Sequence, residues 1–514
     1  MQANRTKNTL KNATTGIAVK LISTLLAFAE RSIFIYALGI QYAGVSGVFT
    51  DVLNILSFAE LGIGTAIVYA LYKPIATNDT DKINRLMNFY KMAYRMIALI
   101  VFVVGLVLLP FLGYIITDVP DVVEDIRLIY ILYIIKTAVS YLFVYKTSFL
   151  IASQREYTVS KIKIITSIFQ TIAQCLLLVV FRKFIIYLLF AIVMSIVVNL
   201  VIARKANVLY PFLKNKEKKT IDKSERSKLF KDVRALFLYK VSGVILNGTD
   251  SIVISSFVGT GVVGMLGNYN LVLHQVYYFI TQIFTAASAS IGNLAASESS
   301  EKQYTVFRKM VFLCFWICSF CCCMLANLLT PFVNIWQSGR YNLSSFVVVL
   351  LVMDLFMKGM MSPVSSFRTS NGLFQQGKYR PLAMAVINIV VSIILAQQIG
   401  LPGVLIGTVF SRLVTQAWYD PLLVYKHVFK KSVKGYYLMY LGFAVFTAIC
   451  CAIPQVVFYF VRLENIYVDF LFKMAVSAIV PITLILIFFR RTKEFREYVE
   501  LVRSMIKRKG MFSK

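Results

Sequence analysis

The chain has 514 residues, of which 58% are hydrophobic and 15% are charged, and its mean hydropathy is +0.73. This composition excludes a soluble globular domain and predicts a membrane protein with many spans. The formal net charge of +30 would suit a nucleic-acid-binding protein, but the basic residues lie between long apolar runs, so no nucleic-acid partner is predicted.

Fourteen apolar segments are each long enough to cross a bilayer as a helix. They span residues 16–38, 43–72, 92–113, 126–150, 160–181, 184–203, 235–258, 262–293, 310–334, 345–366, 381–399, 403–425, 436–461 and 466–489. No small-residue cleavage pattern follows a short apolar core near the start, so the first segment is predicted to be an uncleaved span. The predicted fold class is an all-α polytopic membrane protein with 14 transmembrane helices.

Basic residues alternate between successive turns of the predicted topology. With the N-terminus in the cytoplasm, the inward-facing turns and tails hold about eight times as many Lys and Arg residues as the outward-facing turns. This bias predicts that both termini are cytoplasmic. The basic segments then face anionic membrane lipids, and the tail, residues 490–514, has the pattern of an amphipathic helix lying on the membrane.

The sequence contains an internal repeat. Residues 145–148, Tyr-Lys-Thr-Ser, recur as Phe-Arg-Thr-Ser at 367–370, a shift of 222 positions, and an ungapped shift of 220 aligns 19–56 with 239–276. Spans one to six therefore correspond to spans seven to twelve. Equivalent spans run in the same direction, so the two copies are predicted to be parallel repeats.

The repeat and the charge pattern predict the domain organisation. We expect an N-lobe at 1–203, a basic cytoplasmic linker at 204–234, a C-lobe at 235–425, two extra spans at 426–489 and a cytoplasmic tail at 490–514.

Lysines within the spans are candidate binding residues, because an ammonium in hydrocarbon costs about 2.5–3.5 kcal/mol on insertion scales. Lys136 stands ten residues before Lys146 and is expected near mid-membrane, and the repeat places Lys358 at the equivalent position. An ion pair with Asp354, one helical turn away, is the alternative for Lys358. Lys146 and Arg412 lie near inner span ends, where long side chains reach the headgroups.

Acidic and polar side chains complete the candidate set. Glu30 and Asp250 are equivalent acids on the first span of each lobe, and either could bind a driving proton or sodium ion or neutralise the lysines. His274 could switch charge near neutral pH or be a satisfied core histidine. The further coupling candidates are Asp51 and Glu60, and the further polar candidates are Asn54, Ser140 and Ser362.

Five cysteines between residues 314 and 323 lie within one apolar run. They are predicted to pack as small hydrophobic residues. Neither histidine lies near them, and the chain shows no metal-ligand spacing, catalytic motif or phosphate-binding glycine loop, so no metal, cofactor or enzymatic activity is predicted.

Three local patterns resemble a known family of transporters. They are Leu38-Gly39-x-x-Tyr42-x-Gly44, Glu60-Leu61-Gly62-Ile63-Gly64, and Asp250 followed by Gly259, Gly264 and Tyr269. The chain resembles the polysaccharide-transporter branch of the multidrug/oligosaccharidyl-lipid/polysaccharide exporter superfamily, and particularly bacterial O-antigen and capsule repeat-unit flippases. The likeness extends over essentially the whole chain, although this branch has no fixed motif to match residue by residue.

The resemblance implies a V-shaped transporter in the bacterial cytoplasmic membrane. Such a protein moves a polyprenyl-diphosphate-linked oligosaccharide from the cytoplasmic to the outer leaflet, beside a glycan polymerase or other polysaccharide-assembly proteins. Members have cation-lined cavities, and Arg31, Lys136 and Lys358 fit that character as ligands of the diphosphate.

Three other functions compete with this interpretation. A drug or cation antiporter of the same fold would favour a cavity rich in acids and aromatic residues, whereas bases are at least as prominent here. A peptidoglycan-precursor flippase shares the fold and the anionic lipid substrate. A membrane glycan polymerase or ligase needs a sizeable external loop to hold sugars, and the predicted outward turns are short.

Overall fold

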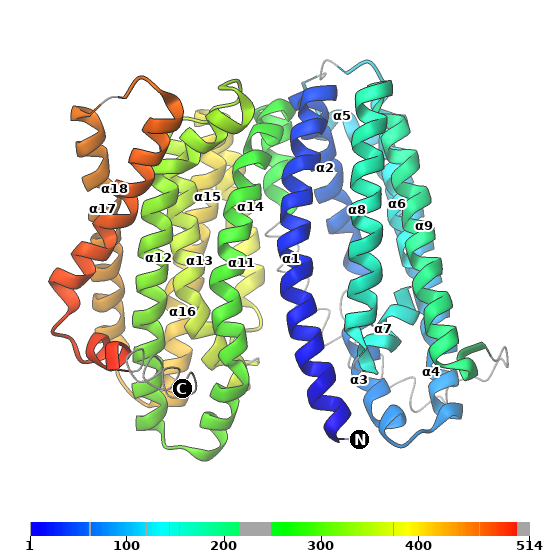
Figure 1. The fold of residues 1–514 in the computed structure, drawn as a ribbon, viewed down its shortest axis with the longest axis horizontal. Helices are drawn as coiled ribbons and strands as arrows, with labels where there is room; N and C mark the ends of the chain where they lie inside the picture. Colours follow the sequence, from blue (N-terminus) through cyan, green and yellow to red (C-terminus); the bar gives the residue numbers. More distant parts are fainter. Residues whose placement is uncertain are drawn as a thin grey trace, which may run out of the picture. The chain divides into compact units, whose positions relative to one another are not determined.

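The computed structural model describes residues 2–60, 63–118, 122–142, 144–153, 155–214, 248–373, 375–461 and 463–500. Every regular element within these residues is a helix (Figure 1). The predicted all-α membrane fold is therefore confirmed. Most of the predicted basic linker, from residue 215 onward, lies outside the described residues.

The chain forms two compact units, Met1–Gly267 and Asn268–Lys514. The helices of the first unit are α1 (Gln2–Leu38), α2 (Ile40–Leu56), α3 (Ile63–Ala76), α4 (Thr80–Leu108), α5 (Leu112–Ile115), α6 (Ile126–Tyr141), α7 (Val144–Ala152), α8 (Glu156–Phe181), α9 (Phe184–Leu209) and a helical segment at 248–257. In this unit α8 packs between α1 and α9, and α9 also packs against α6 (Figure 1).

The first turns of α11 (Thr260–Ser297) belong to the first unit, and the helix continues into the second. The other helices of the second unit are α12 (Ser300–Gln337), α13 (Ser345–Ser370), α14 (Arg380–Ile399), α15 (Leu401–Val414), α16 (Gln416–Val424), α17 (Lys434–Phe460) and α18 (Ile466–Phe489).

Each predicted span coincides, wholly or in part, with described helices. Among the described residues, nine single helices are long and apolar enough to cross a membrane, or ten spans if the bent pair α6–α7 counts as one. Four predicted spans are not among these ten. Two of them are divided: 43–72 into α2 and α3, and 403–425 into α15 and α16. Most of 235–258 lies outside the described residues, and 262–293 is covered by the unbroken helix α11, which does not pass the same test of apolarity.

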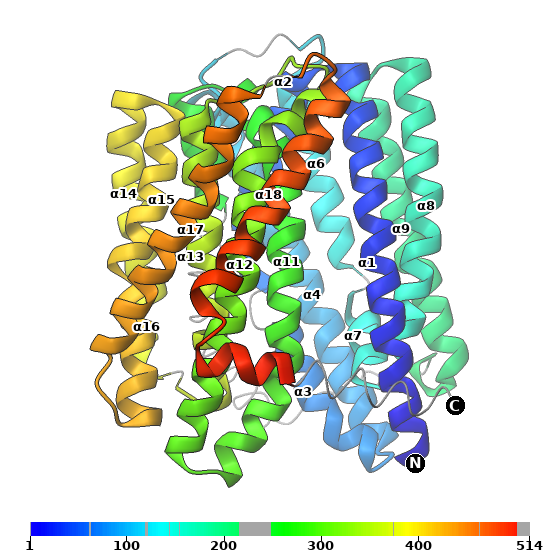
Figure 2. The ribbon, with the colours of Figure 1, turned by 60° about the vertical axis from the view of Figure 1, so that its left-hand side comes forward.

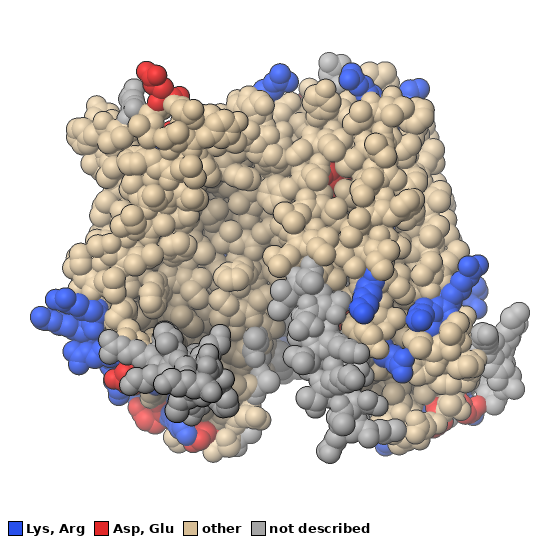
Figure 3. Space-filling model, in the orientation of Figure 1, with Lys and Arg blue, Asp and Glu red and all other residues tan. Residues whose placement is uncertain are grey.

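Large apolar side chains cover the outside of the helices. Leu99, Val107, Phe169, Leu176 and Ile449 are all at least 47% exposed, which would be costly in water but is favourable against lipid. On the face shown in Figure 3, charged side chains gather towards the two ends of the helices and the middle is almost free of them. This is the surface expected of a bundle surrounded by hydrocarbon.

Glycines that the repeat aligns also share their backbone conformation. Gly39 ends α1 with φ of 92°, and Gly259 precedes α11 with φ of 135°. Side chains with a Cβ rarely adopt these values, so each break between helices depends on glycine. The sequence repeat is thus visible as a repeated backbone turn.

A second pair of aligned glycines allows two helices to approach closely. A Cβ on Gly44 of α2 would lie 1.9 Å from the backbone oxygen of Thr260, and one on Gly264 would lie 2.4 Å from that of Ile40. Thr260 and Ile40 are themselves equivalent in the repeat. The contact between α2 and the first turns of α11 is therefore locally symmetric, and larger residues would separate the backbones.

In the second unit, α12 packs against α13, α17 and α18 (Figure 2). The ring of Phe315 stacks on Phe443 of α17 with 3.8 Å between centroids. Cys314, Cys318 and Cys322 are buried and face α13, at Gly359 and Val352, which confirms their predicted packing role. Among the described residues, no group of acids, cysteines and histidines could hold a metal ion.

The described part of the tail packs on the protein. Residues 493–500 are helical, Phe495 is buried, and its ring lies 5.8 Å from that of Trp316 on α12. Arg308 pairs with Glu494 at 2.8 Å, and Lys309 pairs with Glu497 at 2.7 Å. The apolar face predicted to lie on the membrane thus contacts α12 at Phe495.

Candidate functional site

Lys136 lies ten residues into α6, whose first turn is capped by Asp125. At ~1.5 Å per residue this is about 15 Å from the start of the helix. Its side chain is half-buried, and Nζ lies 5.7 Å from the centre of the Tyr133 ring. Within the described residues Lys136 has no hydrogen bond or ion pair, so its charge is available to an anion.

The charge of Glu30 acts on Lys136, although the two groups form no ion pair within the described residues. The carboxylate of Glu30, on α1, accepts a hydrogen bond from the hydroxyl of Tyr187 on α9. The hydroxyls of Tyr133 and Ser46, on α6 and α2, lie 2.6 Å apart. Helices α1, α2, α6 and α9 therefore supply one polar cluster inside the first unit.

Arg31 follows Glu30 on α1 but interacts with a different element. Its Nη2 donates to the backbone oxygen of Gly264 at 2.7 Å. A Cβ on Gly267 would lie 2.8 Å from the same nitrogen, so glycine leaves room for the guanidinium. Arg31 contributes positive charge, but part of its donor capacity is used by the backbone of α11.

The other candidates of the first unit are dispersed. Asp51 lies beside Asn54 and Ser251, Glu60 interacts with Tyr94 and Tyr141, and Ser140 donates to the backbone oxygen of Thr137 at 2.7 Å.

Asp250, in the helical segment 248–257, is half-buried and engages neighbouring groups. His274, on α11 in the second unit, has an exposed side chain. Neither arrangement by itself reveals an ion site or a charge switch.

In the second unit, Asp354 joins two basic residues. Its Oδ2 lies 2.6 Å from Nζ of Lys358 on the same helix, and its Oδ1 accepts from Nε of Arg412 on α15 at 2.8 Å. Nη1 of Arg412 donates to Gln416 at 2.9 Å. The alternative interpretation of Lys358, an ion pair with Asp354, is therefore present in the structure. Arg412 is 8% exposed, so the expectation that it reaches the headgroups is wrong.

Lys358 and Arg412 both line a cavity of about 240 Å³ whose walls come from α11, α13, α15 and α16. Ser362, predicted as a polar candidate, lines the same cavity. The structure thus brings together the two C-lobe candidates Lys358 and Ser362, and it adds Arg412.

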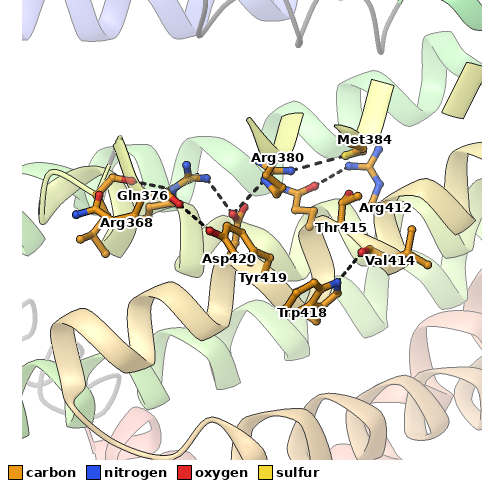
Figure 4. Close-up of polar contacts among 12 residues, drawn as sticks. Arg368, Gln376, Arg380, Met384, Arg412, Val414, Thr415, Trp418, Tyr419 and Asp420 are labelled. Atoms are coloured by element: carbon orange, nitrogen blue, oxygen red, sulfur yellow. Dashed lines mark hydrogen bonds and ion pairs between the residues drawn. The ribbon is translucent and has the colours of Figure 1, made fainter. Parts of the chain in front are cut away.

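A further charged cluster of the second unit joins Asp420 to two arginines (Figure 4). Oδ1 of Asp420, on α16, accepts from Nη1 of Arg368 at 2.9 Å and lies 3.2 Å from Nε of Arg380. The side chains of Asp420 and Arg368 are 2% and 7% exposed. Nε of Arg368 also donates to the backbone oxygen of Leu373. These contacts hold the adjoining ends of α13, α14 and α16 together.

The repeated motif therefore has a structural role in both copies. Lys146, which the repeat aligns with Arg368, donates from Nζ to Oδ1 of Asn207 on α9 at 2.9 Å. In each copy the basic residue after an aromatic residue binds a polar side chain in or just after the sixth predicted span of its lobe: Asn207 follows span 184–203 on α9, and Asp420 lies within 403–425. The position of Lys146 near a span end predicted contact with lipid headgroups. The structure shows that its partner is Asn207.

A large apolar groove lies between α12, α13, α16, α17 and α18 in the second unit. Its volume is about 940 Å³, and its lining includes Val349, Met353, Leu441, Ala448 and Trp418. Lys473 also lines it, and this lysine pairs with Asp469 at 2.7 Å. A groove of this size with few polar groups suits a long hydrocarbon chain.

Sequence reasoning missed Tyr187, Arg368 and Asp420 as members of polar clusters. Asp420 sits at the predicted inner end of a span, where a charge looks solvated, and Tyr187 looks like an interface aromatic. The sequence held one signal for the ion pair between Arg368 and Asp420: a base and an acid lie near the same predicted end of different spans.

No protein-family model and no curated protein matches the chain. Solved structures do match its fold. The lipid II flippase MurJ in an inward closed conformation has a TM-score of 0.68 and 15% sequence identity, covering 93% of this chain and 99% of that one.

Two MATE transporter structures show the same fold. An inward-facing MATE transporter of the MOP superfamily gives a TM-score of 0.57 at 13% identity, covering 80% of this chain and 96% of that one. The MATE transporter VcmN of Vibrio cholerae gives 0.55 at 13% identity, covering 84% and 100%. The chain therefore has the fold shared by MurJ and MATE transporters.

Proposed function

We propose that this protein is a flippase that moves a polyprenyl-diphosphate-linked oligosaccharide from the cytoplasmic to the outer leaflet by alternating access. The observation that carries the proposal is Lys136, a charged residue deep in a helix with no counterion at hydrogen-bonding distance among the described residues. A half-buried ammonium of this kind can replace part of the hydration that a diphosphate loses on leaving water.

The diphosphate is assigned to Lys136 and Arg31, which lie in the same unit. Arg31 supplies a second positive charge from α1, and a guanidinium can bind phosphate oxygens in a bidentate manner. Lys358 was predicted as a third ligand, but its charge is offset by Asp354 at 2.6 Å. The apolar groove of the second unit is assigned to the lipid chain, because each buried CH₂ group contributes about 0.8 kcal/mol.

Deletion of the gene, followed by analysis of lipid-linked glycans, tests this function. We expect one complete repeat unit to accumulate on its lipid carrier, facing the cytoplasm. Accumulation of a peptidoglycan precursor would instead identify the second candidate, a precursor flippase, which the fold shared with MurJ favours. Normal levels of both lipids, with increased sensitivity to cationic drugs, would point to a drug antiporter.

The proposed location is the bacterial cytoplasmic membrane, with both termini inside. Single cysteines at Asn215 and Asn342, in a background without native thiols, test the topology. We expect an impermeant maleimide added outside intact cells to label the Asn342 site and not the Asn215 site, because the basic segments are retained in the cytoplasm. Labelling of Asn215 from outside would contradict the 14-span arrangement.

Glu30 is the proposed coupling residue of the first unit, with Asp250 as its repeat mate. We expect Glu30→Gln to flatten the dependence of transport on a proton or sodium gradient, because the amide cannot be protonated or carry charge. The amide can still accept the hydrogen bond from Tyr187, so the fold should be kept.

Asp250→Asn is measured in parallel, and Glu298→Gln, outside the predicted spans, is the control. Transport driven by imposed gradients in vesicles is the readout. Unchanged gradient dependence in both span variants would remove both acids from the coupling mechanism.

The groove gives a prediction with a matched control on α17. Ala448 lines the groove, whereas Val445, one turn away, is exposed and does not line it. We expect Ala448→Trp to reduce flipping several-fold by occupying space needed by the lipid chain, and Val445→Trp to leave it near normal. Equal rates in the two variants would show that the lipid chain does not use this groove.

A further inference from the structure

The cavity of about 240 Å³ in the second unit differs from the apolar groove in its chemistry. One wall is α11, with Tyr277, Thr281 and Thr285, and another is α13, with Ser362 and Ser365. Hydroxyl groups therefore face the space from two helices. A cavity of this size accommodates a small ring rather than a drug-sized ligand, for which about 300 Å³ or more is usual.

Several of these hydroxyls are available to a ligand. In the part of the chain that the structure describes, Ser362, Ser365 and Tyr277 make no side-chain hydrogen bond. Thr281 and Thr285 donate to backbone oxygens of their own helix and keep lone pairs that can accept. The cavity can thus both donate and accept hydrogen bonds, which is the combination that binds sugar hydroxyls.

The charges around the cavity sum to a single positive charge. Lys358 and Arg412 line it, and Asp354, which pairs with both, is the one acid that compensates them among the residues that the structure describes. Arg412 uses Nε for Asp354 and Nη1 for Gln416, and none of its nitrogens is a buried donor without a partner. A cavity with a net charge of +1 and several hydroxyl groups matches a ligand with one negative charge and several hydroxyl groups.

We propose that this cavity binds one carboxylate-bearing sugar ring, of the uronic-acid class, within the transported oligosaccharide. The inference rests on the proposed flippase function and specifies its substrate. A diphosphate carries more negative charge than the cavity compensates and has no ring hydroxyls to pair with the serines. A neutral hexose would leave the net positive charge of the cavity uncompensated and would lack a charge-assisted hydrogen bond, which is about twice as strong as a neutral one.

Saturation-transfer NMR on the purified full-length protein tests the cavity directly. The probes are glucuronic acid, glucose and glucose 1-phosphate. We expect glucuronic acid to bind at least about fivefold more tightly than glucose, in line with the added charge-assisted contact. Equal binding of these two sugars, or stronger binding of glucose 1-phosphate, would overturn the proposal.

Two variants connect this binding to the cavity. Ser365→Leu fills the space, and Lys358→Gln removes the net charge while Asp354 keeps its partner Arg412. Both should abolish the preference for glucuronic acid, and Val445→Trp, which lines neither the cavity nor the groove, should keep it. A preference that survives in Ser365→Leu and in Lys358→Gln would place the binding elsewhere.

Proteoliposomes separate this proposal from the flippase function. They are loaded with the same lipid diphosphate bearing a glucuronate-containing or a glucose-only oligosaccharide. Faster flipping of the acidic glycan supports both proposals. Equal rates would reject the acidic-sugar subsite and keep the flippase. If neither lipid moves although glucuronic acid binds, the flippase function is wrong, while the NMR result still supports binding of an acidic sugar in the cavity.

Discussion

Replacing Lys136 by methionine is expected to lower transport of the lipid-linked glycan at least about tenfold while leaving the protein folded. Methionine keeps the apolar stem and removes the ammonium, which we assign to the diphosphate. A loss of one charge-assisted contact, at about 1.5–3 kcal/mol, corresponds to a change of roughly tenfold or more. Flipping in proteoliposomes is the measurement, with a thermal unfolding curve for each variant.

Stability distinguishes a binding role of Lys136 from a structural one. Removing a half-buried charge that has no ion-pair partner among the described residues also removes its desolvation penalty, so Lys136→Met should unfold at the same temperature or higher. Lys136→Arg keeps the charge and should retain much of the activity, although the guanidinium has a different shape.

The matched control for this prediction is Lys146→Met. Here Nζ donates to Asn207, so the same substitution should lower stability by about 1 kcal/mol and leave transport nearly intact. If Lys136→Met transports normally, or loses activity only because it unfolds, Lys136 does not bind the substrate.

The helical membrane fold was predictable because the bilayer imposes a simple rule on the sequence. Backbone N–H and C=O groups in hydrocarbon must form their hydrogen bonds within a helix, and the side chains of that helix must suit lipid. Each crossing therefore appears as a long apolar run. Glycine added local information: Gly39 and Gly259 were aligned by the repeat, and both have positive φ in the structure. Hydropathy did not reveal that α15 ends at Val414 and α16 begins at Gln416.

The partners of the charged residues were not predictable beyond one helical turn. The pair between Asp354 and Lys358 was a stated alternative, because four residues on a helix face each other. Arg412 lies 58 positions from Asp354, and no periodicity relates them. The sequence therefore identified Lys358 and Ser362 as candidates but could not show that Arg412 completes their cavity.

The tail illustrates the same limit for an apolar helix face. Spacing predicts which side of the helix is apolar, but it does not say whether that side meets lipid or protein. Phe495 packs against Trp316, and acidic residues on the tail pair with basic residues of α12. Complementary charge at Glu494 and Glu497 was the available signal, and it was hidden within a strongly basic segment.

Replacing Asp420 by asparagine is expected to be among the most destabilising single substitutions in the second unit. Asp420 is the shared counterion of Arg368 and Arg380, and its side chain is 2% exposed. Loss of its charge would remove the carboxylate that Arg368 and Arg380 share, and the side chain of Arg368 is only 7% exposed. Breaking a buried ion pair in this way typically costs about 3–5 kcal/mol, far more than the loss of a surface pair.

The cluster also predicts how that loss can be reversed. Asp420→Asn combined with Arg368→Gln and Arg380→Gln removes all three charges and should recover a large part of the stability, since no buried charge then lacks a partner. Asp469→Asn, which breaks the more exposed pair with Lys473, is the control and should have a small effect. Unfolding curves of the purified variants give the free-energy differences. If Asp420→Asn is no less stable than the control, water or lipid headgroups compensate the two arginines, and the cluster does not fasten α13, α14 and α16 together.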